Sequence, residues 1–168
     1  MSGARAEAWR RALMTAALVI AIDQASKALV LANFRLGESD PVFPGVDLTY
    51  VRNTGVAFGA LAGGGAIVWV LTGLALCGLL VYFALRSDRR WLWLPVGMIA
   101  GGAIGNLVDR ARHGWVVDFI DFVAWPAFNV ADMSIVVGIL AFAYVAEMDG
   151  GPRTADGGGS RTADGGSA

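Results

Sequence analysis

Two long stretches of this chain contain no charged side chain. No Asp, Glu, Lys or Arg occurs in residues 53–85 or in residues 91–108, which are 33 and 18 residues long. A helix crosses the hydrocarbon core of a bilayer with about 20 apolar residues, and a charge placed there is costly. The chain is also 56% hydrophobic and only 16% charged. It is therefore predicted to be a membrane protein and not a water-soluble globular domain.

Four membrane-spanning segments can be drawn along the chain. We place them at residues 12–32, 60–85, 91–108 and 128–148. At a rise of about 1.5 Å per residue, each is roughly 27 to 39 Å long, which suits a hydrocarbon core of about 30 Å. We expect helices because a membrane β-barrel would need alternating strands. The predicted fold is a mainly α-helical, four-span membrane protein with a single domain, residues 1–149.

The first span also has features of a cleavable signal peptide. Arg10 and Arg11 precede the uncharged residues 12–22, as a charged region precedes an apolar one in such peptides. Apolar residues resume after Lys27, however, and no clear cleavage site of small residues precedes a polar start. We therefore expect this segment to be retained.

The arginines near the membrane ends predict the orientation. The N-terminal arm and the loop between the second and third spans hold six arginines, and the other two loops hold four. Because cytoplasmic loops carry the excess of positive charge, both termini are predicted to be cytoplasmic. The two longer loops then lie outside.

Two segments outside the spans have distinct character. Residues 46–51 read as a strand between turn residues, so we expect a small sheet on the membrane surface. Residues 150–168 repeat Arg-Thr-Ala-Asp-Gly-Gly and show no apolar periodicity. They are predicted to form a disordered, glycine-rich cytoplasmic tail.

Composition excludes several kinds of chemistry. The net charge of −1 speaks against a nucleic-acid binder that depends on bulk charge. Cys77 and His113 are the only residues of their types, which removes His/Cys zinc sites and most Ser/His or Cys/His nucleophiles. We expect no metal and no cofactor, so that carboxylates, amides and the backbone carry any chemistry.

Several polar residues fall within or beside the spans. Asp23 and Lys27 are four residues apart on one helical face. They form either an ion pair that merely lowers its own cost, or a pair that holds other polar groups in the bundle. Asn106, Asp109 and Arg110 end the third span, where they could simply mark the outer membrane boundary. The glycines just before them, Gly101, Gly102 and Gly105, have the spacing of close helix packing.

The densest polar cluster surrounds the start of the fourth span. Asp118 and Asp121 precede it, while Asn129 and Asp132 share a helical face about one turn inside the outer rim. In one interpretation the acids are interfacial charges and Asp132 a partner of the helix dipole. In the other, Asp118 folds against Asp132 to form a carboxylate pair that shares a proton, which is the chemistry of aspartic proteases.

Two other classes of protein compete with a peptidase. A small transporter or proton pathway would also place Asp23, Asp118 and Asp132 in a bundle. Its acids should be distributed through the membrane, whereas two of these three lie near one rim. A structural subunit would explain the glycines but not the cluster of Asn and Asp residues.

Five segments in order resemble lipoprotein signal peptidase, also called signal peptidase II, across residues 12–147. These segments read Asp23-Gln24-x-x-Lys27, Asn53-Thr54-Gly55-Val56-Ala57-Phe58-Gly59, Gly101-Gly102-Ala103-Ile104-Gly105-Asn106-Leu107-Val108-Asp109-Arg110, Val116-Val117-Asp118-Phe119 and Phe128-Asn129-Val130-Ala131-Asp132. The one mild departure is Val56, where the family usually has Ala.

The resemblance implies a bacterial inner-membrane aspartic peptidase. Such an enzyme removes signal peptides from diacylglyceryl-modified prolipoproteins by cutting before the lipobox cysteine. The family's catalytic aspartates match Asp118 and Asp132, and Asp121 is left out because the family's acid follows Val-Val. The family's fold adds a small β-cradle and a short helix on the extracytoplasmic face. We expect the first at the strand of residues 46–51 and the second in the loop before Phe128, the loop that also carries Asp118. We expect a monomer in contact with lipid. The supporting residues match Asp23, Lys27, Asn53, Gly55, Asn106, Arg110 and Asn129.

Overall fold

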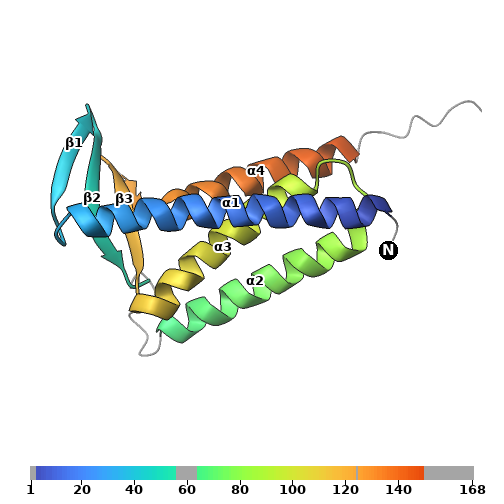
Figure 1. The fold of residues 1–168 in the computed structure, drawn as a ribbon, viewed down its shortest axis with the longest axis horizontal. Coiled ribbons are helices and arrows are strands. Elements are labelled where there is room, and N and C mark those ends of the chain that lie inside the picture. The colour runs from blue at the N-terminus through green and yellow to red at the C-terminus, as the bar shows by residue number, and fades with distance from the viewer. Residues whose placement is uncertain (1–2, 56–63, 124, 150–168) are drawn as a thin grey trace, which may run out of the picture.

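The computed structural model describes residues 3–55, 64–123 and 125–149. Its helices form an elongated bundle, and a small sheet lies at one end (Figure 1). The N-terminus and the turn between the second and third helices lie at the opposite end of the bundle (Figure 1). The helices are α1 (Gly3–Asn33), α2 (Gly64–Arg86), α3 (Trp93–His113) and α4 (Val130–Asp149).

Among the residues that the structure describes, three helices are long and apolar enough to cross a membrane, by length and composition. They are Gly3–Asn33, Ala66–Arg86 and Val130–Met148. Large apolar side chains on their outer faces are open, as for Leu74 and Leu140, which are 65% and 66% exposed. Such exposure suits a hydrocarbon solvent, because lipid tails are as apolar as leucine.

The central helix of the bundle is α3, which contacts α1, α2 and α4. A Cβ atom added at Gly101 would lie 2.8 Å from the carbonyl oxygen of Ala16 in α1. One added at Gly102 would clash with the carbonyl oxygen of Ala131 in α4. Only glycine allows both neighbouring backbones to come this close, so the predicted packing role of these glycines is confirmed.

The sheet is antiparallel and has the strand order β1-β2-β3-β4. The second strand confirms the strand predicted at residues 46–51. The loop before Phe128, where we expected the short extracytoplasmic helix, forms the last two strands instead. β-branched and aromatic residues in that loop favour strands over a helix, and β3 pairs with β2 while β4 pairs with β3. The strands are β1 (Ser39–Phe43), β2 (Val46–Asn53), β3 (Val116–Phe122) and β4 (Trp125–Phe128).

Most element boundaries differ from those predicted. Helix α1 begins at Gly3, before the predicted start of the first span at residue 12. The charged residues in its first turns fit the helix because Glu7 accepts hydrogen bonds from Arg10 at 2.8 Å and from Arg11 at 2.7 Å. The third helix runs past residue 108 to His113. The predicted tail at 150–168, the start of the second span at 60–63 and the motif residues 56–59 lie outside the described residues.

The sheet is fixed to the bundle by a buried apolar cluster. Val30 at the end of α1 packs with Tyr50 of β2 and with Val117 and Phe119 of β3. This contact holds β3 beside the ends of α1, α3 and α4. Polar residues from all four elements therefore meet at the junction of sheet and bundle.

Candidate active site

Two aspartates lie at the junction of the sheet and the bundle. Asp118 comes from β3, not from a loop as expected, and is only 1% exposed. Asp132 lies half-buried in the first turn of α4. Along the chain, only a short connection, β4 and Asn129 separate β3 from α4. The carboxylate of Asp118 therefore comes to the N-terminus of α4.

Asn129 connects the two aspartates. Its Oδ1 accepts a hydrogen bond from the backbone N–H of Asp132 at 3.0 Å, and its own N–H donates to Oδ2 of Asp132 at 3.3 Å. This reciprocal pair is a capping box that begins α4. The Nδ2 of the same asparagine donates to Oδ1 of Asp118 at 2.7 Å. Asn129 is fully buried, so it holds both carboxylates in a defined relation.

Asn53 holds the other oxygen of Asp118. Its Nδ2 donates to Oδ2 of Asp118 at 2.9 Å, and its Oδ1 accepts from the backbone N–H of Gly55 at 2.9 Å. Gly55 has φ +75°, a conformation that side chains rarely adopt. The chain thus turns sharply after β2 with the asparagine held toward Asp118.

The environment of Asp118 favours its protonated form. Burial raises the pKa of the Asp118 carboxyl to about 6, and the negative charge of Asp132 acts in the same direction. The hydrogen bonds donated by Asn53 and Asn129 oppose this rise in pKa, because they stabilise the carboxylate.

Asn106 of α3 links the aspartates to a second, deeper cluster. Its Nδ2 donates to Oδ1 of Asp132 at 2.8 Å. Its Oδ1 accepts from Nζ of Lys27 at 3.0 Å and from Nδ2 of Asn129 at 3.2 Å. The oxygen and the nitrogen of the Asn106 side-chain amide therefore both have hydrogen-bond partners, which fix the orientation of this amide.

The deeper cluster is a buried ion triad. Nζ of Lys27 lies 2.9 Å from Oδ2 of Asp23 and 2.9 Å from Oδ2 of Asp109. The side chains of these three residues are at most 4% exposed. Oδ1 of Asp23 also accepts from the backbone N–H of Ala131 at 2.9 Å. The pair at positions 23 and 27 thus forms the predicted ion pair and also anchors the start of α4.

Glycine is required beside this triad as well. A Cβ atom added at Gly105 would lie 2.6 Å from Oδ2 of Asp23. The third predicted packing glycine therefore makes room for a carboxylate and not only for a helix backbone.

Two residues of this network were not among the predicted site residues. Asp109, which we considered a boundary marker, accepts a hydrogen bond from the backbone N–H of Val117 at 3.1 Å. Gln24 donates to Oδ1 of Asp109 at 2.9 Å. The signal for both was present, since each lies inside a motif that supplied other site residues, next to Asp23 and within one turn of Asn106.

Arg110 and Asp121 lie at the margin of the cluster. The half-buried Arg110 donates to the backbone oxygen of Asn106 at 3.4 Å, within its own helix. Asp121 pairs opposite Asp47 in the sheet. Within the part of the chain that the structure describes, no hydrogen bond or ion pair joins Asp121 to the cluster, and no group of three His, Cys, Asp or Glu side chains is placed to hold a metal ion.

An apolar groove opens beside Asp132. It has a volume of about 310 Å³. The aromatic side chains of Trp125 and Phe128 in β4 form one wall, and Met133, Val136 and Val137 of α4 form the other. One carboxylate therefore lies at the edge of a surface that suits an extended apolar ligand.

Comparisons with known proteins match this chain to one family. The family model for signal peptidase (SPase) II matches residues 15–147. The lipoprotein signal peptidase of Moorella thermoacetica is 46% identical over 134 residues, covering 79% of this chain and 89% of the relative. That of Enterococcus faecalis is 38% identical over 138 residues, covering 79% and 85%.

Two solved structures are also similar to this chain. A bacterial membrane enzyme determined by the in meso method at 1.9 Å resolution has a TM-score of 0.73 and 30% sequence identity, covering 82% of this chain and 93% of that one. A second, at 2.3 Å resolution, has a TM-score of 0.75 and 29% identity, covering 87% and 93%.

Proposed function

Since the chain belongs to the signal peptidase II family and is a peptidase, we propose that it removes signal peptides from diacylglyceryl-modified prolipoproteins by cutting before the lipobox cysteine, with Asp118 and Asp132 as its catalytic residues. One observation carries the assignment of the residues. Asn129 binds both carboxylates, at 2.7 Å from Asp118 and 3.3 Å from Asp132. Such a shared partner is expected for two acids that act on one water molecule.

The two aspartates take different parts in the reaction. Asp132 is the base, because its two carboxylate oxygens accept hydrogen bonds from the Asn106 side chain and from the backbone N–H of Asn129, which leaves them placed to accept a proton. Asp118 holds the proton, because it is buried and its pKa is raised to about 6. Asp132 takes a proton from water as the water oxygen attacks the scissile carbonyl carbon, and Asp118 donates its proton to the carbonyl oxygen. The C–N bond then breaks as Asp132 passes its proton to the leaving amine. At the same time a hydroxyl of the tetrahedral intermediate returns its proton to Asp118 and becomes the carbonyl of the new carboxylic acid, so the pair again holds one proton.

The surrounding residues act by positioning. Asn53, Asn106 and Asn129 orient the carboxylates through the hydrogen bonds described above. Asp23 and Lys27 hold the start of α4 against α1 and α3. In this proposal Gly55 allows the turn that presents Asn53, and Arg110 contributes positive charge at the margin of the cluster.

We propose that α3 is a fourth membrane span and that residues 1–149 form one domain. Its 21 residues match the length of the other spans, and it packs among them. The arginine distribution supports cytoplasmic termini, which would place the sheet and the aspartates at the extracytoplasmic face of the bacterial inner membrane. The role of α1 in the ion triad supports its retention in the mature protein.

The groove beside Asp132 suits the lipid-linked substrate. Its α4 wall carries apolar side chains such as Val136 and Val137, which are 57% and 49% exposed. A substrate held in the same bilayer reaches the site at high effective concentration, and the lipid positions the bond to be cut. The enzyme is proposed to act on such substrates as a monomer.

Cleavage of matched substrates tests this function. The purified protein in lipid should cut a diacylglyceryl-modified prolipoprotein to give a product that begins at the modified cysteine, as read by mass spectrometry. The same precursor without the lipid should be cut far more slowly. Equal cleavage of both precursors, or cleavage elsewhere, would contradict the proposed specificity. Proton or solute flux through proteoliposomes without peptidase activity would favour the transporter alternative.

The pKa of Asp118 predicts a specific pH dependence. Because the reaction uses a protonated Asp118, kcat/KM should fall as the pH rises above about 6. Asn53→Ala removes a hydrogen bond that stabilises the carboxylate, so the pKa should rise and the alkaline limb should move to higher pH. Asn33→Ala removes an exposed amide from α1 and is the control, with an unchanged profile expected. An unmoved limb in Asn53→Ala, or one displaced to lower pH, would contradict the assignment of Asp118 as the proton donor.

A further inference from the structure

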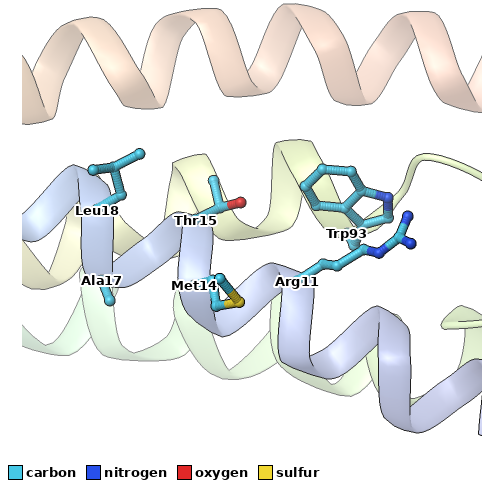
Figure 2. Close-up of a pocket in the computed structure, with 6 residues that line it drawn as sticks. All are labelled: Arg11, Met14, Thr15, Ala17, Leu18 and Trp93. Atoms are coloured by element: carbon cyan, nitrogen blue, oxygen red, sulfur yellow. The ribbon is translucent and has the colours of Figure 1, made fainter.

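Two neighbouring hollows lie at the end of the bundle away from the sheet. The first is an open groove of about 660 Å³ along α1, lined by Met14, Ala17 and Leu18 and ended by Arg11 and Trp93. Figure 2 shows Arg11 and Trp93 together at one end of this groove and Leu18 at the other. The second hollow, of about 220 Å³, shares Arg11 and Trp93 with the first. Its other lining includes Ser87, Asp88, Arg89 and Arg90 from the turn between α2 and α3.

We propose that these two hollows together bind one anionic phospholipid, with its phosphate in the smaller hollow and an acyl chain in the groove. A ligand that fits both must have a negatively charged end and a long apolar end. Phospholipid has this combination and is present wherever a membrane protein resides. The proposed site is far from Asp118 and Asp132 and does not depend on their role.

The smaller hollow offers donors for a phosphate. Arg11 and Arg90 line it with exposed side chains, and guanidinium groups suit phosphate oxygens in number and geometry. The acids nearby are already paired. Glu7 accepts from Arg10 and Arg11, and Asp88 lies 3.9 Å from Arg5. Three arginines, Arg11, Arg89 and Arg90, line the hollow against two acids, Glu7 and Asp88, and these acids also pair with Arg10 and Arg5. Positive charge therefore remains in excess at this end.

The buried hydroxyl of Ser87 is a second observation that favours a ligand in the smaller hollow. Ser87 lines the smaller hollow and is 2% exposed, yet its Oγ has no hydrogen-bond partner among the residues that the structure describes. A buried hydroxyl without a partner is costly, and most such groups in proteins are satisfied. A phosphate oxygen bound between the arginines would supply the acceptor that this serine lacks.

The turn between α2 and α3 is held in a strained conformation at Trp91. Its φ of +68° is unusual for a residue with a bulky side chain. The side chain is 48% exposed and lies with its ring centroid 6.2 Å from that of Trp93. The guanidinium groups of Arg90 and Arg11 each lie 5.7 Å from the centroid of one of these rings. Tryptophan and arginine at one level are typical of the headgroup region of a membrane.

The groove fits an acyl chain and not a polar ligand. Met14 and Leu18 are each 61% exposed, although both are apolar. The groove leads from the guanidinium of Arg11 along α1 toward the middle of the bundle, which is the direction an acyl chain takes from its phosphate. In the orientation proposed above, this end faces the cytoplasmic leaflet, where anionic lipids attract basic clusters.

Lipid binding by the purified protein tests the proposal. Native mass spectrometry of the detergent-solubilised protein should show tighter binding of phosphatidylglycerol than of phosphatidylcholine with the same acyl chains. Glycerol phosphate and inorganic phosphate should not compete at similar concentrations, because they lack the chain. Equal binding of the two lipids would overturn the proposal. Effective competition by the free phosphates would also overturn it, as would a dimer of the chain that forms through α1 in place of lipid binding.

Charge variants locate the phosphate. Arg11→Gln and Arg90→Gln should each weaken phosphatidylglycerol binding about fivefold. Arg35→Gln removes one exposed arginine at the opposite end of α1 and should leave the binding unchanged. Loss of affinity in all three variants to the same degree would show a general charge effect and would contradict this site.

Two further variants test the chain and the serine. Ala17→Trp fills the groove at an exposed position and should abolish selective binding, whereas Ala146→Trp adds the same bulk to an exposed position of α4 and should not. Ser87→Ala should weaken phosphatidylglycerol binding while raising the melting temperature of the lipid-free protein, because it removes a buried hydroxyl without a partner. A Ser87→Ala protein that binds the lipid as tightly as the wild type would contradict the proposed contact.

Discussion

Replacing either Asp118 or Asp132 by asparagine is expected to lower the rate of signal-peptide release by at least about a thousandfold. General acid and base catalysis together account for effects of roughly this size. An amide cannot take the proton from water in place of Asp132, and it cannot donate a carboxyl proton in place of Asp118. The measurement is single-turnover cleavage of a diacylglyceryl-modified precursor, with membrane insertion of each variant verified first.

Asp121→Asn is the matched control for these variants. Asp121 lies on the same strand as Asp118 and is three residues away, but it pairs opposite Asp47 at the outer part of the sheet. We expect this variant to retain much of its activity. Full activity in both dyad variants would refute the proposed pair, and complete loss in Asp121→Asn would show that the wrong partner of Asp132 had been chosen.

Lys27→Met is expected to destabilise the protein by about 3 to 5 kcal/mol. The ammonium group lies 2.9 Å from a carboxylate of Asp23 and 2.9 Å from one of Asp109, and all three side chains are buried. Removing the cation leaves two buried acids without a countercharge, which costs more than the pair contributed. Thermal unfolding in detergent should show a large fall in the melting temperature, and the peptidase activity should fall with it.

Two variants make this prediction specific. Arg35→Met removes one exposed positive charge from the loop after α1 and should change the melting temperature little. Adding Asp109→Asn to Lys27→Met should recover part of the lost stability, because one of the two unpaired acids is then neutral. An unchanged melting temperature in Lys27→Met would contradict a structural role for the triad.

The location of the polar cluster could be predicted from the residues because charge is rare in this chain. Asp23, Lys27, Asn106 and Asp132 interrupt apolar helices, and a polar group in that setting calls for a partner. The structure places all four in one hydrogen-bonded network. The strand at residues 46–51 was recognisable for a similar local reason, since turn residues bound it on both sides.

The partner of each polar group could not be predicted in the same way. Asp109 resembled a charge at the membrane boundary, and only the fold shows that it is buried against Lys27 and the backbone of Val117. The expected short helix before Phe128 was wrong because β2 offers that segment a strand to pair with. Spacing along the chain carries no information about which distant segment lies alongside.

Membrane character, the long apolar helices and the residues that break the apolar pattern follow from the chain alone, because hydropathy and helical spacing are local properties. The long uncharged stretches 53–85 and 91–108 already exclude a soluble fold. Which acids become partners depends on tertiary structure. Glycines in α3 let three helices approach, and the Val30 cluster brings β3 to the start of α4. Asn129 can therefore bind Asp118 and Asp132 together, since such a contact requires segments that only packing brings together.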